Sequence, residues 1–226
     1  MQRSLVLNVN FYHRKHLINP YLLESKYIYR LIVNSKCTRP YSEKKWQRIL
    51  SVSLTKSDWS KIYCNNYYPL KYKKLCEFKY KILLDILPCG NSVSKWNSKV
   101  SNVCKYCKSN EDVPHMLFEC KMIKPIWITL SNCLSMNIKL QQVILGIRST
   151  DYVSLNKHLC IAIVAYSIFS NWCKSSFDNV QCNIYDLKCE IRKKLAFYKE
   201  VYKLVYAKPQ SQNLQNLIDC MLYHLN

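Results

Sequence analysis

The sequence predicts a mainly α-helical protein, an irregular helical bundle that carries a small Cys3His knuckle. The chain has 226 residues, of which 49% are hydrophobic, so it is long enough to bury a sizeable core. Its two glycines, Gly90 and Gly146, are too few for the many tight turns of a β-sandwich and exclude a glycine-rich phosphate loop. Apolar residues recur at helical spacing in several segments, which makes helix the expected default.

The first helices are predicted on either side of Pro40, which breaks the chain. One covers about residues 20–34 and a second covers about 43–51, built around Trp46. A short helix then carries Trp59 and Ile62. These segments make the N-terminal part helical.

The segment 70–87 is predicted to be one continuous helix. Leu75, Phe78, Ile82 and Ile86 fall on one face, and Pro88 with Gly90 would end it. The remaining polar stripe holds Lys74, Glu77, Lys81 and Asp85, in which opposite charges follow at i, i+4. We interpret this stripe as a solvated face rather than a phosphate groove.

Four residues follow with the spacing C-x2-C-x7-H-x4-C: Cys104, Cys107, His115 and Cys120. Three sulfurs and an imidazole at such intervals can close a tetrahedral Zn²⁺ site with no open position, which predicts a structural zinc ion. The polar stretch 109–112 suits a loop between the two ligand pairs. The alternative is a set of small buried thiols with a core histidine.

Three helical segments are predicted after the knuckle. Pro125 fits the first turn of a helix that runs to Leu134, 156–172 is apolar nearly all round, and 184–206 carries a regular apolar stripe. We divide the chain into an N-terminal helical part (1–92), the Cys3His element with its following helix (93–135) and a basic helical part (136–226).

The net charge of +20 predicts a polyanionic partner, either nucleic acid or an acidic membrane surface. Three thiolates and one Zn²⁺ would change it only to about +19. On the segment 184–206, Lys188, Arg192, Lys199 and Lys203 project within about 60° of one another and extend over about 22 Å. The acids of the segment fall on other faces, so we expect this stripe to lack local counter-charges, and it could follow several phosphates. A solvated helix face is an equal alternative for this stripe. The candidate contacts are Lys95, Trp96, Lys99, Lys105, Tyr106, Lys108, Lys188, Arg192, Lys199 and Lys203.

An unpaired base could stack on Trp96 or Tyr106, but for Trp96 we expect packing in the core instead. The thirteen cysteines are odd in number, and no secretory signal is visible. The apolar run 159–169 is too short to span a bilayer. We therefore expect no membrane association and a reducing intracellular location.

In order and spacing, several of these segments resemble the zinc-binding C-terminal region of reverse transcriptases from non-LTR (LINE-like) retrotransposons. The resemblance is strong from about 70 to 135, moderate from about 25 to 69 and loose beyond Gly146. Its strongest part is carried by 75–83, Ile86-Leu87-Pro88, Lys95-Trp96, the Cys/His set, Glu111-Asp112, Met116-Leu117-Phe118 and Trp127.

The sequence departs from that family in its catalytic parts. It has no Phe/Tyr-x-Asp-Asp polymerase motif and no Asp-Asp pair, and no Pro-Asp marks a restriction-like nuclease. We expect a detached C-terminal domain or a truncated reading frame, with the polymerase core separate or missing.

The resemblance implies a non-catalytic, zinc-stabilised domain that binds template RNA or target DNA during target-primed reverse transcription. It would then act in the nucleus at the site of integration, and otherwise in the cytoplasm. The alternative is a zinc-pinned helical scaffold that docks on protein. An enzyme is disfavoured because the fourteen acidic residues are scattered and His13, His16 and His158 have no recognisable nucleophile partner.

Overall fold

A computed structural model describes residues 11–13, 16–18, 39–67, 70, 72–149, 151–178, 180 and 183–225. The chain forms two compact units, Met1–Pro40 and Tyr41–Asn226. In the first unit β1 (Phe11–His13) pairs antiparallel with β2 (His16–Ile18). The helix predicted over 20–34 lies outside the described residues.

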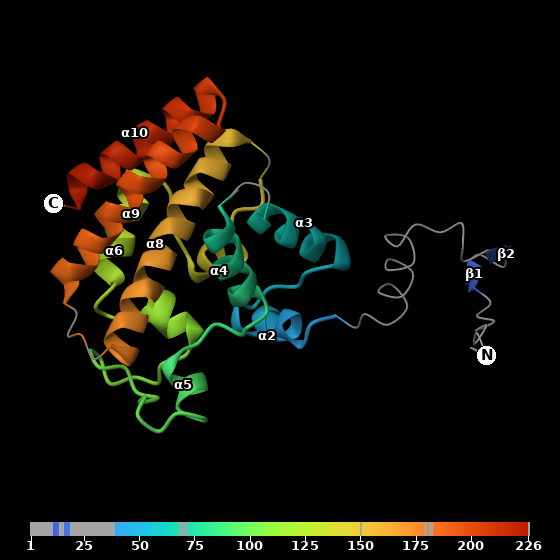
Figure 1. Cartoon of the computed structure of the whole chain (residues 1–226), viewed down its shortest axis with the longest axis horizontal. Helices are drawn as coiled ribbons and strands as arrows, with labels where there is room; N and C mark the ends of the chain where they lie inside the picture. Colours follow the sequence, from blue (N-terminus) through green and yellow to red (C-terminus); the bar gives the residue numbers. More distant parts are fainter. Residues whose placement is uncertain are drawn as a thin grey trace, which may run out of the picture. The chain divides into compact units, whose positions relative to one another are not determined.

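The second unit is helical, which confirms the predicted mainly α class (Figure 1). Its elements are α2 (Tyr41–Ile49), α3 (Lys56–Tyr67), α4 (Lys73–Leu83), α5 (Gly90–Val93), the π-helical turn η2 (His115–Glu119), α6 (Lys124–Cys133), α7 (Leu140–Leu145), α8 (Tyr152–Phe177), α9 (Ile184–Val205) and α10 (Lys208–His224). The boundaries predicted at 92/93 and 135/136 both fall inside this unit.

The centre of the unit is α8, which packs against α4, α7, α9, α10 and η2 (Figure 1). Its N-terminus is capped by Asp151, whose carboxylate accepts the backbone N–H of Ser154 at 2.8 Å. The predicted central helix is thus confirmed and extends one turn beyond 156–172 at each end. Among the described residues, α8 is the one helix whose length and composition would allow it to cross a membrane, and 61% of its most apolar window is buried within the fold.

The helix predicted over 70–87 is shorter in the structure. It ends at Leu83, and Asp85 adopts a left-handed backbone with φ of 56°. This turn leaves Ile86 59% exposed, so its predicted place on the buried face is wrong. Asp85 no longer follows the helical stripe and pairs with Lys45 of α2 instead.

Polar side chains are buried where α7 ends. Lys79 of α4 is fully buried, and its Nζ donates to the carbonyls of Val143 at 2.6 Å and Ile144 at 3.1 Å. These are among the last carbonyls of α7, which lack helical partners. The side chain of Lys79 therefore ties α4 to the C-terminal end of α7.

The predicted helix over 184–206 is confirmed as α9, and Asn183 caps it by accepting the N–H of Asp186 at 2.9 Å. A further helix, α10, was not predicted. It begins with Pro209 in its first turn and buries Leu214, Ile218 and Met221. It packs against α6, α8 and α9, so it completes the bundle on the side away from α4.

Candidate metal centre

The first half of the centre is a tight turn that carries two cysteines. An isolated antiparallel bridge joins Val103 to Asn110, and the N–H of Cys104 donates to Ser109 at 2.8 Å. Lys108 takes a left-handed conformation with φ of 61°, and its N–H donates back to the carbonyl of Cys104 at 3.0 Å. The chain thus folds back as the hairpin-like knuckle that the sequence predicted.

The second half is η2, which begins with the histidine and ends next to the last cysteine. The carboxylate of Asp112 accepts the N–H of His115 at 2.9 Å, and the N–H of Cys120 donates to the carbonyl of His115 at 3.0 Å. Five residues along an α-helix would place the two side chains about 140° apart. The wider i→i+5 turn brings them back to one side. The π-helical turn is therefore the reason that the side chains of His115 and Cys120 can bind the same ion.

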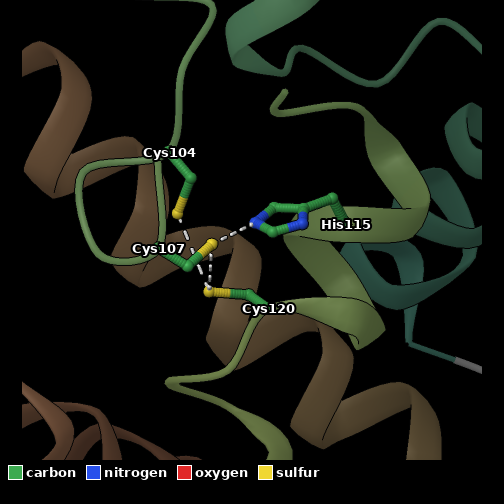
Figure 2. Close-up of side chains that lie close together, drawn as sticks. All are labelled: Cys104, Cys107, His115 and Cys120. Atoms are coloured by element: carbon green, nitrogen blue, oxygen red, sulfur yellow. Dashed lines mark hydrogen bonds between the residues drawn. The ribbon is translucent and has the colours of Figure 1, made fainter. Parts of the chain in front are cut away.

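The four side chains converge at one point (Figure 2). Cys120 Sγ lies 3.7 Å from Cys104 Sγ and 3.9 Å from Cys107 Sγ, and Cys107 Sγ lies 3.2 Å from His115 Nε2. A tetrahedral Zn²⁺ with Zn–S bonds of about 2.3 Å has sulfur–sulfur edges of about 3.8 Å and sulfur–nitrogen edges of about 3.5 Å. The spacing fits zinc, and it is far longer than a disulfide bond.

Electrostatics favour a cation at this point. Burial raises the pKa of the Cys120 thiol to about 12 and also raises the pKa of Cys104. Burial, the largest single influence, opposes ionisation of Cys107 as well, but hydrogen bonds from Ser109 and Cys104 and the charge of His115 together outweigh it and lower the pKa of Cys107 to about 6. A divalent cation would supply the positive charge that allows the two buried thiols to ionise beside it.

Two tryptophans fix the knuckle to the helical core. Trp127 of α6 donates from Nε1 to the carbonyl of Leu117 at 3.0 Å and packs against Phe118, so it holds η2. Trp172 of α8 donates from Nε1 to the buried carboxylate of Glu111. In the sequence Glu111 belongs to the polar stretch between the two ligand pairs, and its partner on α8 was not predicted.

The residues proposed to contact nucleic acid near the knuckle differ in their surroundings. Trp96 is 70% exposed, so the expectation that it packs in the core is wrong. It lies between the exposed Lys95 and Lys99, and Lys108 is also exposed. The Lys105 ammonium instead donates to the carbonyl and the hydroxyl of Ser175, near the C-terminal end of α8.

Tyr106, the second aromatic residue proposed for stacking, is 43% exposed on the same turn as the first two cysteines. The two exposed lysines beside Trp96 form no ion pair among the described residues. We call the surface formed by Lys95, Trp96 and Lys99 the Trp96 surface.

The basic stripe on α9 is partly neutralised, contrary to the expectation that it lacks counter-charges. Lys199 pairs with Asp219 of α10 at 2.6 Å, and Lys203 lies 3.9 Å from Glu200. The helix that the sequence analysis missed thus supplies one of the acids. Lys188 and Arg192 are half-buried and have no ion-pair partner within the described ranges.

Residues 41–127 match the family model described as zinc-binding in reverse transcriptase. No curated protein and no solved structure matches the chain. The matched segment runs from α2 into α6 and contains Cys104, Cys107, His115 and Cys120. It is a zinc-binding domain of reverse-transcriptase type, which confirms the predicted resemblance to reverse transcriptases at this level.

Proposed function

We propose that this chain is a non-catalytic, nucleic-acid-binding C-terminal domain of a LINE-like reverse transcriptase. In this role it engages template RNA or target DNA during target-primed reverse transcription, in the nucleus at the site of integration. The match over 41–127 supports a reverse-transcriptase context, and the net charge of +20 supports a polyanionic partner.

In this proposal Zn²⁺ is structural. Cys104, Cys107, His115 and Cys120 would fill all four positions of a tetrahedral ion, and none would be left for water or substrate. The ion would join the turn 102–111 to η2, which Trp127 and Trp172 hold against the core. The ion would thereby fix the position of the Trp96 surface next to the knuckle.

The observation that carries the proposal is the exposure of Trp96 between two exposed lysines. A flat aromatic ring offers an unpaired base a stacking face, and flanking cations hold the backbone phosphates. The Trp96 surface follows α5, which is attached to the knuckle because the N–H of Asn91 donates to the carbonyl of Glu111 at 2.9 Å. In this proposal zinc binding and base stacking are linked through this short path.

The proposal is tested by binding of the zinc-loaded protein to labelled single-stranded RNA and to duplex DNA over a salt series. Trp96→Ala should weaken single-strand binding by about 5- to 150-fold, the usual range for one stacked base. Tyr41→Ala is the matched control, since Tyr41 is 75% exposed on α2 and should leave binding unchanged. Replacing Lys95 and Lys99 together should reduce the salt slope by about 1.4 for a single strand.

Binding that is absent, or that does not weaken with salt, would contradict the proposal. Equal losses from Trp96→Ala and Tyr41→Ala would contradict the role of the Trp96 surface. The nucleic acid that the wild-type protein binds more tightly would identify the partner as RNA or DNA.

A second function is supported by apolar residues on the outer side of α9. Phe197 is 51% exposed and Leu204 is 88% exposed, and residues seven apart on a helix lie on nearly the same side. Such a ridge could dock on a polymerase core as a zinc-pinned scaffold. Salt-resistant binding to that core, lost in Leu204→Ser and kept in Trp96→Ala, would favour this alternative.

A further inference from the structure

A second group of metal-binding side chains lies outside the segment that matches the family model. Cys133 is the last residue of α6, and Cys220 and His224 belong to the last two turns of α10. One ligand atom from each residue lies within 4.8 Å of those from the other two. From this juxtaposition we propose that Cys133, Cys220 and His224 form a second zinc site with three protein ligands.

The backbone places these ligands without strain. Cys220 and His224 are four residues apart on one helix, so their side chains point to the same side one turn apart. The third ligand comes from a different helix that packs directly against α10. Leu130 of α6 and Met221 of α10 line the same small cavity, so the C-terminal parts of the two helices lie close together.

The donor set selects the kind of ion. Two thiolates and one imidazole favour Zn²⁺ or another thiophilic ion over Mg²⁺ or Ca²⁺, which prefer oxygen. The ligand atoms lie at most 4.8 Å apart, whereas the edges of a zinc tetrahedron are about 3.8 Å long. Side-chain movements of about 1 Å would therefore bring them to zinc geometry. His224 is exposed and both cysteines are partly buried, so the fourth position faces solvent and accepts water.

This site would have a different role from the Cys3His centre. It would fasten α10 to α6, and α6 begins inside the segment of reverse-transcriptase type. With a water ligand it is open, and a chelator can reach the ion more easily than one enclosed by four protein ligands. The inference does not depend on nucleic-acid binding.

The test counts zinc ions per chain by native mass spectrometry on the full chain, purified with reductant and loaded with Zn²⁺. The wild-type protein should carry two ions, whereas Cys220→Ser and His224→Ala should each carry one. Cys64→Ser is the matched control, because Cys64 is exposed and belongs to neither group, and it should keep two. Cys104→Ser should keep the ion on α10.

His224→Ala removes an exposed side chain, so it tests the site even if Cys220→Ser fails to fold. In the wild-type protein a mild chelator should remove one ion quickly and the other slowly. A single ion in the wild-type protein, unchanged in His224→Ala, would overturn the proposal. A disulfide between Cys133 and Cys220 that persists in reductant would overturn it as well.

Discussion

The fully buried Lys79 predicts that stability rises with pH between neutral and mildly alkaline conditions. Burial lowers its pKa from the ordinary 10.5 to about 7. Below pH 7 the folded and unfolded chains both hold the proton, and the folded chain bears the whole cost of the buried charge. Between pH 7 and 10.5 the unfolded chain holds a proton that the folded chain lacks, so the free energy of unfolding increases with pH.

With these two pKa values, linkage gives an increase of about 2 kcal/mol between pH 7 and pH 9. The assay is urea denaturation of zinc-loaded wild-type protein and Lys79→Met at pH 7, 8 and 9. Zinc ligands release protons in both proteins, so their contribution cancels in the difference between the two curves. The absolute stability of the variant is not the readout, because the change also leaves the Val143 and Ile144 carbonyls without their donor.

The difference between wild-type and variant stability should change by about 2 kcal/mol over this range, with the wild-type protein gaining. A difference that stays constant from pH 7 to 9 would refute the reasoning. It would mean that the two carbonyls at the end of α7 hold Lys79 as a buried ammonium ion.

Two further substitutions test how the knuckle is fixed to the core. In Gly90→Ala the new Cβ would lie 2.6 Å from the Ser101 carbonyl oxygen and 2.7 Å from Glu111 Oε1, so thermal or urea unfolding should show a loss of about 1–3 kcal/mol; an unchanged midpoint would contradict this close approach. Trp127→Phe removes the donor to Leu117 and should cost about 1–3 kcal/mol and speed zinc release to a chelator. Trp46→Phe is its control, because Trp46 donates to carbonyls of α4; equal zinc release from both variants would argue against a role of Trp127 in holding η2.

Much of the fold was predictable because its strongest signals are local. The apolar run 156–172 and the stripe over 184–206 each predicted a helix that the structure contains as α8 and α9. Spacing alone was also enough to predict that Cys104, Cys107, His115 and Cys120 converge. A ligand set separated by short loops needs little knowledge of tertiary structure.

Features that depend on distant partners were not predictable in the same way. The acceptors of Lys79 are 64 and 65 residues away, so nothing near it in sequence marks it as buried. The acidic partner of Lys199 comes from α10, a helix that was overlooked although Pro209 and the spacing of Leu214, Ile218 and Met221 could have indicated it. With α9 predicted as the last long helix, the acid that neutralises Lys199 could not be foreseen.

Trp96 shows a different limit. Tryptophan is usually well buried, and this general preference outweighed the flanking lysines in the prediction. In the structure the chain turns directly after α5, and Val93 and Val100 fill the buried positions on either side. Composition could not reveal which of the nearby apolar residues would remain outside.

The central claim is that zinc at the Cys3His centre orders the knuckle, and hydrogen exchange of residues 102–120 tests it most directly. The measurement compares zinc-loaded and chelator-treated forms of the wild-type protein, Cys120→Ser and the control Cys64→Ser. Zinc should protect this segment in the wild-type protein and in Cys64→Ser but not in Cys120→Ser, while α8 and α9 remain protected throughout. Zinc-dependent protection in Cys120→Ser, or none in the wild-type protein, would contradict a structural zinc at this site.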